Sequence, residues 1–256
     1  MRITLIPSSF GRNEASQLQY LTSYLINNNV AIDAGCLGVY GTPQEQARIK
    51  HVFISHAHID HLATLPIFVE NAQEGNSECV VIYASRPVLD SLQDDIFNHR
   101  VWPDFVNLTS NNVPFLKLEM LESGRPIQLE SLRIIPVSVN HVVPTLGFVI
   151  EDATSTVLIS SDTGPTDEIW EYANRSSHLK AVFLEVTFPD ALGELAAKAK
   201  HLTPASLAQE ARKLNSPVPI YVVHIKARYY DQVVGELQAL DLPNLQIAEP
   251  GRTYSF

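Results

Sequence analysis

A run of six residues, His-Ala-His-Ile-Asp-His at positions 56–61, constrains this chain more than any other part of its sequence. The run follows an apolar segment, 51–55, with the composition of a β-strand, and it precedes an apolar stretch with helical spacing. Two histidines two residues apart suit one borderline metal ion, and the adjacent aspartate and histidine suit a second. A solvated polar turn is the alternative, but three histidines in six residues seldom arise without a metal. The run therefore predicts a metal site in a strand-to-helix loop.

The rest of the chain alternates short apolar runs with amphipathic stretches. Runs rich in β-branched and aromatic residues between Gly, Asn and Pro breakers predict strands at 2–6, 19–26, 30–33, 51–55, 80–84, 133–139, 146–151, 156–160, 181–186 and 220–224. Helices are expected at 61–71, 87–97, 167–174, 204–214 and 231–240. Thr203 followed by Pro204 marks a helix start. Strands followed by helices, twice over, predict an α/β (α+β) chain with two mixed β-sheets face to face and helices on both outer faces. Residues 1–256 are expected to form one domain.

The net charge and the hydropathy of the chain limit the kinds of partner that it can bind. The formal charge of −10 opposes binding to long nucleic acids, which depends on Lys and Arg neutralising many phosphates. A small anionic substrate is compatible with this charge, because bound metal ions supply local positive charge. The apolar runs are far shorter than the roughly 20 residues that span a bilayer, and the first residues lack the apolar core of a signal peptide. We therefore expect a cytoplasmic protein with no membrane partner, its two cysteines, Cys36 and Cys79, reduced.

The pattern H-x-H-x-D-H at 56–61 resembles the signature of the metallo-β-lactamase superfamily, whose fold is an αββα sandwich with metals at the sheet edges. The resemblance continues in order along the chain, always after an expected strand. It implies two divalent transition-metal ions, zinc first with manganese and iron as alternatives, and a hydroxide bridging them. The implied ligands are His56, His58 and His141 on one ion, Asp60, His61 and His224 on the other, and Asp162 bridging both. Alone, a histidine at a strand end is more often a satisfied polar residue.

Further segments resemble the class II 3′,5′-cyclic-nucleotide phosphodiesterases. They are Asp-Ala-Gly-Cys-Leu-Gly at 33–38, Phe-Asn-His-Arg-Val-Trp-Pro-Asp-Phe at 97–105, Glu-Val-Thr-Phe at 185–188, His-Leu-Thr-Pro at 201–204 and His-Ile-Lys at 224–226. A similar order of Glu, His and terminal His occurs in RNase Z, but no Gly-Pro-rich arm for grasping tRNA is evident. The resemblance implies hydrolysis of cAMP or cGMP to the nucleoside 5′-monophosphate.

The same resemblance suggests roles for residues around the metals. His201 is the expected proton donor, oriented by Glu185, with Asp60 completing the catalytic set; alternatively His201 caps the following helix or binds a phosphate oxygen. The side chains expected to wall the purine base are Asn98, His99 and Trp102. Trp102 would stack on the base, although burial beside Pro103 is an equally good interpretation.

Other functions remain as alternatives. An RNase Z-like phosphodiesterase acting on RNA 3′ ends and a thioester or lactone hydrolase would use the same metals, whereas a β-lactamase fits less well. A non-catalytic scaffold is disfavoured by the intact ligand set, and a redox di-iron protein by histidine at position 58, where such relatives usually place Glu. The expected partners are a small anionic nucleotide and a second copy in a homodimer.

Overall fold

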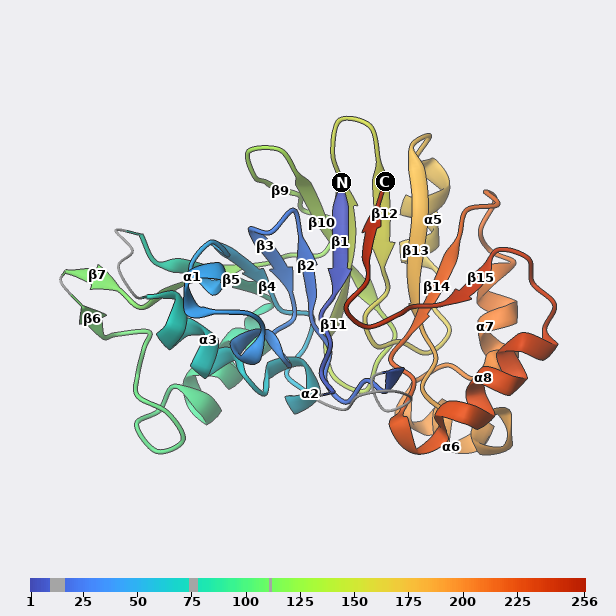
Figure 1. Cartoon of the computed structure of the whole chain (residues 1–256), viewed down its shortest axis with the longest axis horizontal. Helices are drawn as coiled ribbons and strands as arrows, with labels where there is room; N and C mark the ends of the chain where they lie inside the picture. The colour runs from blue at the N-terminus through green and yellow to red at the C-terminus, as the bar shows by residue number, and fades with distance from the viewer. Residues whose placement is uncertain (10–16, 74–77, 111) are drawn as a thin grey trace.

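Two seven-stranded β-sheets pack face to face in the computed structural model, which describes residues 1–9, 17–73, 78–110 and 112–256 (Figure 1). The first sheet has the order β16-β1-β2-β3-β4-β5-β8, and the second has the order β15-β14-β13-β12-β11-β10-β9. The strands of the first are β1 (Arg2–Leu5), β2 (Tyr24–Ile26), β3 (Val30–Ile32), β4 (His51–Phe53), β5 (Val80–Ala84), β8 (Leu116–Met120) and β16 (Thr253–Ser255). Those of the second are β9 (Ile127–Gln128), β10 (Arg133–Val139), β11 (Thr145–Glu151), β12 (Thr156–Ile159), β13 (Leu179–Glu185), β14 (Ile220–Val223) and β15 (Leu245–Ile247).

Helices cover the outer face of each sheet. The helices are α1 (Pro43–Gln46), α2 (Ile59–Leu62), α3 (Leu65–Ala72), α4 (Arg86–Ser91), α5 (Glu168–Arg175), α6 (Gly193–Ala199), α7 (Pro204–Ala211) and α8 (Tyr230–Ala239). A π-helical segment, Leu92–Ile96, continues α4. Two further short strands, β6 (Thr109–Ser110) and β7 (Val113–Pro114), pair antiparallel with each other. None of the helices in the described ranges is long and apolar enough to cross a membrane.

Three layers of buried side chains hold this arrangement together. Phe53, Phe148 and Phe183 belong to the cluster between the two sheets. A second cluster packs α3 and α4 on the first sheet, and a third packs α5, α7 and α8 on the second. Burying a side chain of this size contributes roughly 1.5–3 kcal/mol each. The expected order of helices, two sheets and helices is confirmed.

The carboxyl ends of five strands meet at one edge of this sandwich. In the second sheet β12, β13 and β14 are parallel, and β10 runs in the same direction because β11 is antiparallel to both neighbours. β4 of the first sheet ends at the same edge, where the Leu146 N–H donates to the Ser55 carbonyl at 3.1 Å and links the two sheets. Residues that follow these strands are thereby brought together, as at the carboxyl edge of other α/β sheets.

Two expected elements differ from the structure. The helix expected at 61–71 is broken into α2 and α3, because Thr64 leaves the helical conformation and its hydroxyl accepts from Gly38 N–H and donates to the Ala34 carbonyl. The strand expected at 19–26 is reduced to Tyr24–Ile26. The expected helix start is confirmed: Thr203 caps α7, with Pro204 in its first turn.

Candidate metal centre

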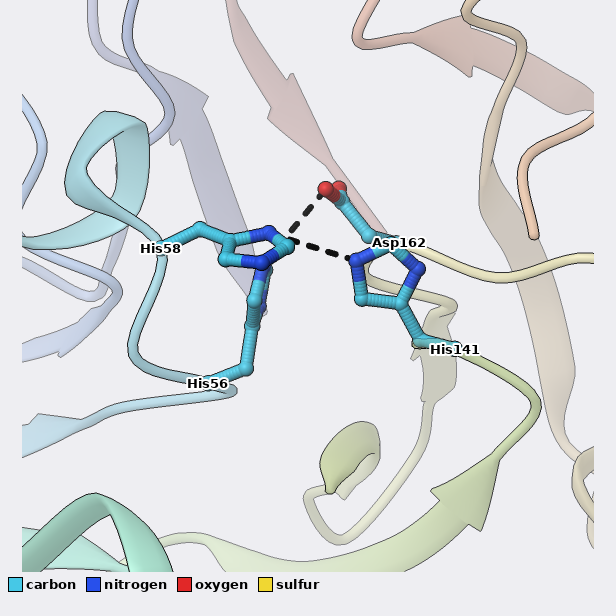
Figure 2. Close-up of side chains that lie close together, drawn as sticks. All are labelled: His56, His58, His141 and Asp162. Carbon is cyan, nitrogen blue, oxygen red and sulfur yellow. Dashed lines mark hydrogen bonds and ion pairs between the residues drawn. The ribbon is translucent and has the colours of Figure 1, made fainter. Parts of the chain in front are cut away.

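A first group of possible ligands gathers at the sheet edge, although its members are up to 106 positions apart in the chain. The donor atoms of His56, His58, His141 and Asp162 lie within 4.8 Å of one another. His58 Nδ1 lies 3.3 Å from His141 Nε2, and His56 Nε2 lies 3.5 Å from Asp162 Oδ2. Figure 2 shows the three rings and the carboxylate directed at a common point.

A second group adjoins the first and shares its carboxylate. The donor atoms of Asp60, His61 and His224 also lie within 4.8 Å of one another. Asp162 Oδ1 is 3.3 Å from His61 Nε2 and 3.4 Å from His224 Nε2. Asp162 therefore contacts histidines of both groups, the placement that a bridging ligand requires. The seven residues are together called the His/Asp cluster below.

The backbone is bent at the positions that direct these side chains. Asp33, Ser161 and His224 each adopt a left-handed conformation, with φ of 59°, 54° and 61°. Such a conformation costs a non-glycine residue of order 1–3 kcal/mol and is typically retained at functional sites. Here the bends turn the chain at the ends of β3, β12 and β14, so that Asp162 and the ring of His224 face the cluster.

The cluster has the free donor atoms that a metal requires. Nε2 of His56 and Nε2 of His61 are buried and have no hydrogen-bond partner within the described part of the chain. A buried polar atom without a partner costs about 1–3 kcal/mol. A divalent cation would satisfy both nitrogens, and histidines with carboxylates suit zinc, manganese or iron. The residues present therefore fit two transition-metal ions.

The opposite ring nitrogens are held by other protein atoms. Nδ1 of His56 lies 2.9 Å from Ser55 Oγ, Nδ1 of His224 lies 2.8 Å from Thr187 Oγ1, and Nδ1 of His141 lies 3.1 Å from the Lys200 carbonyl. Partners of this kind orient a metal-binding ring and hold the proton on its outer nitrogen. Nε2 of each of these histidines is thereby left to face the cluster.

Burial and charge set the protonation of the cluster. Burial, with the neighbouring ring of His61, lowers the pKa of His56 to about 2, and burial also lowers the pKa of His58 and of His141. These three imidazoles are therefore neutral at pH 7, the form that binds metals. Burial alone would lower the pKa of His61, but the charges of Asp162 and Asp33 outweigh burial and raise it. Burial alone would raise the pKa of Asp162, but the charges of His224 and His61 lower it.

Glu185 and His201 form a hydrogen-bonded pair beside the cluster. Glu185 Oε1 lies 2.6 Å from His201 Nδ1, the contact expected from the sequence, and Thr187 Oγ1 donates to Oε2 at 2.8 Å. Burial would lower the pKa of His201, but the charge and hydrogen bond of Glu185 outweigh burial and raise it. A ring nitrogen of His201 also lies within 4.8 Å of ligand atoms of Asp162 and His224. The alternative that His201 caps α7 is wrong, since Thr203 is the cap.

The three residues expected to bind the base are not gathered with the cluster. Asn98 closes a local turn, where its side chain accepts from the N–H groups at positions 100 and 101. His99 is exposed and lies 3.9 Å from Asp104, and the Trp102 ring packs edge-on against Phe105. Trp102 also contacts the core beneath the first sheet, which agrees with the burial interpretation. Their role as a base wall stays a prediction.

Sequence reasoning assigned no role to Asp33, Ser55 or Thr187. Asp33 Oδ2 lies 2.6 Å from His61 Nδ1 and accepts from Ser55 Oγ at 2.9 Å, while Ser55 Oγ also contacts His56. One buried carboxylate thus orients a histidine in each of the two groups. The sequence did offer one indication of a role for Asp33. This residue directly follows an apolar strand, and it begins the segment 33–38, which resembles the phosphodiesterases.

Replacing Asp33 with Asn should weaken metal binding without removing a ligand. Asn keeps the shape of the side chain but offers one acceptor oxygen where the carboxylate serves both His61 and Ser55. Loss of such a partner typically lowers metal affinity by about 10–100-fold. Metal titration against a competing chelator measures the effect, with Asp90→Asn on α4, where the carboxylate is 45% exposed, as the matched control. Unchanged affinity would show that the His61 ring is held by other contacts.

The sequence of this chain matches a protein family and several known proteins. Residues 28–225 match the family described as the beta-lactamase superfamily domain. A probable 3′,5′-cyclic-nucleotide phosphodiesterase of Yersinia pestis is 26% identical over 223 residues, which cover 77% of this chain and 62% of that protein's own length.

Solved structures show the same fold at low sequence identity. Unliganded yeast PDE1 superposes with a TM-score of 0.77 at 18% identity, covering 98% of both chains. The short form of human tRNase Z superposes with a TM-score of 0.68 at 16% identity, covering 100% of this chain and 98% of that one. The family match spans well over half of the residues and includes each member of the His/Asp cluster, so this chain belongs to the metallo-β-lactamase superfamily.

Proposed function

We propose that this protein is a metal-dependent phosphodiesterase that hydrolyses 3′,5′-cyclic nucleotides to nucleoside 5′-monophosphates. The observation that carries the proposal is the buried His/Asp cluster lying directly beside the hydrogen-bonded pair of Glu185 and His201. The Yersinia relative, described as a probable 3′,5′-cyclic-nucleotide phosphodiesterase, supports the substrate class.

The cluster would hold two divalent ions, zinc first with manganese and iron as alternatives. His56, His58 and His141 would hold one, and Asp60, His61 and His224 the other, with Asp162 between them. When bound, two such ions would lower the pKa of water toward 7, from about 16, and would neutralise charge on phosphoryl oxygens. The surrounding residues contribute by holding each ring in one tautomer, as Ser55 and Thr187 do.

His201 would supply the proton that the leaving group needs. Opening the cyclic ester expels the ribose 3′ oxygen, whose alkoxide is a strong base and leaves slowly without a proton. Glu185 holds Nδ1 of His201 at 2.6 Å, so Nε2 is the ring atom free to deliver a proton. The raised pKa of His201 favours the imidazolium, the form that can act as a general acid.

The proposal also covers the size of the substrate, the oligomeric state and the location of the protein. A net charge of −10 fits a small nucleotide better than long RNA, because the chain has few cations to track a phosphate backbone. We also propose that the protein is a cytoplasmic homodimer.

A substrate panel on the purified protein tests the proposal directly. The panel contains cAMP, cGMP, an RNA with a 3′ extension, a thioester and a lactone, and metal content is measured on the same sample. We expect two transition-metal ions per chain and release of the nucleoside 5′-monophosphate from a cyclic nucleotide. Turnover of the RNA, thioester or lactone alone, or release of a 3′-monophosphate, would contradict the proposal.

A further inference from the structure

A small pocket adjoins the cluster on the side of Asp60 and His224. Its lining consists of residues 19–22, Asp60 and residues 224–226. The two chain segments are held together by a parallel bridge between Gln19 and Lys226, and the Thr22 N–H donates to the Asp60 carbonyl at 2.8 Å. The segment that leads into β2 thus lies against the end of β14 (Figure 1). A substrate with its phosphate at the cluster has this pocket directly beside it.

An aromatic ring stands exposed in the lining. The side chain of Tyr20 is 58% exposed, and Ile59, between two residues of the cluster, is 68% exposed. The backbone of Tyr20 is ordered, because its N–H donates to Ser8 Oγ at 2.7 Å. An aromatic ring on a fixed backbone loses little conformational entropy when a flat partner stacks on it. Tyr20 therefore has the exposure and support that stacking on a nucleobase requires.

The same pocket contains a cation that is not neutralised. Lys226 is exposed, and within the described ranges its ammonium group makes no ion pair or hydrogen bond. Its charge acts on the ring of His201, so it is felt inside the catalytic site. In a chain with net charge −10, a free cation at this point is available to a phosphate oxygen.

We propose that the surface around this small pocket is the nucleoside subsite of the enzyme. Tyr20 stacks on the base there, and Lys226 binds a phosphate oxygen that does not belong to the bond being cleaved. The inference rests on the proposed function and assigns the base contact to the segment before β2. Of the residues expected from the sequence to wall the base, Asn98 and His99 contact neighbouring residues in the chain, and Trp102 packs on Phe105 and the core beneath the first sheet.

Equilibrium binding separates the two contacts. Adenosine 5′-monophosphate carries base and phosphate, whereas ribose 5-phosphate lacks the base, so calorimetry with both probes isolates the stacking contribution. Tyr20→Ala should weaken binding of the nucleotide by about 5–100-fold, the range for loss of one base–aromatic stack, and leave ribose 5-phosphate unchanged. Tyr20→Trp should restore nucleotide binding. Lys226→Met should weaken both probes about tenfold, and less at high salt.

Two control variants match these changes on the edge strand β8. Met120→Ala removes a side chain that is 52% exposed, and Lys117→Met removes an exposed cation. Both should bind the two probes as the unmodified protein does. If Tyr20→Ala binds the nucleotide normally, or loses both probes equally, the subsite assignment is wrong while the phosphodiesterase proposal stands. If the unmodified protein neither binds the nucleotide nor cleaves cAMP, the proposed function fails and the subsite with it.

Discussion

Asp162→Ala should abolish metal binding at both halves of the His/Asp cluster and remove turnover with it. The carboxylate is 2% exposed, and its oxygens lie 3.3–3.5 Å from Nε2 of His56, His61 and His224. Removing it would leave one ion with three histidines and the other with Asp60 and two histidines, and no anion shared between them. Loss of a residue that only hydrogen-bonds to a metal ligand lowers metal affinity by about 10–100-fold. Loss of Asp162, itself a ligand, should therefore lower metal affinity by more than about 100-fold.

Metal analysis and titration on the variant measure this effect independently of activity. Asp162→Asn keeps the volume of the side chain but not its charge, so it should fold and show the same loss. Asp90→Ala, which removes an exposed carboxylate on α4, should retain both ions and full turnover. Treating the unmodified protein with a chelator should reproduce the Asp162→Ala result. If Asp162→Ala retains two ions and full activity, another residue bridges them.

His201→Ala should slow hydrolysis of a cyclic nucleotide by roughly 10²–10⁴-fold while both metal ions remain bound. The expected size follows from the leaving group, because expulsion of the 3′ alkoxide depends on protonation in the transition state. Metal binding should survive, because Nδ1 of His201 is committed to Glu185 and the seven cluster residues complete both ligand sets without it.

A substrate with an acidic leaving group separates proton transfer from phosphate binding. A nucleoside 5′-phosphate ester of 4-nitrophenol expels an oxygen that needs no proton, so His201→Ala should slow it far less than it slows cAMP. Glu185→Gln should show a milder form of the same selectivity, because the ring keeps a partner but loses the charge that favours the imidazolium. Equal slowing of both substrates with both ions bound would mean that His201 binds phosphate instead.

Much of the sandwich was readable from local sequence. All ten strands expected from apolar runs are present, the one at 19–26 in shortened form, and Val80–Ala84 and Arg133–Val139 have the expected bounds. Each of these strands lies between two neighbours in its sheet, and its sequence is rich in buried apolar and β-branched residues. The order of the ligands along the chain was equally visible, because all of them lie in the segments that follow such strands.

Within the two seven-stranded sheets, the strands that were not expected are β8, β9, β15 and β16, and each stands at an edge of its sheet; the short pair β6 and β7 was not expected either. Edge strands are short and carry polar side chains, which protects an open edge but weakens the sequence signal. β8 reads Leu-Lys-Leu-Glu-Met with only Leu116 buried. Its pairing with β5 is set by the sheet already formed and not by its own composition.

The contacts that orient the cluster histidines and form the pocket beside them could not be predicted from the sequence either. Asp33 reaches His61 across 28 positions, and Gln19 pairs with Lys226 across more than 200, because the sheets bring their strand ends to one edge. Residue types and spacing specify which side chains can bind a metal, since that depends on donor chemistry near a strand end. Which hydroxyl or carboxylate holds each ring, and which exposed ring borders the substrate, depends on long-range strand pairing that no local pattern encodes.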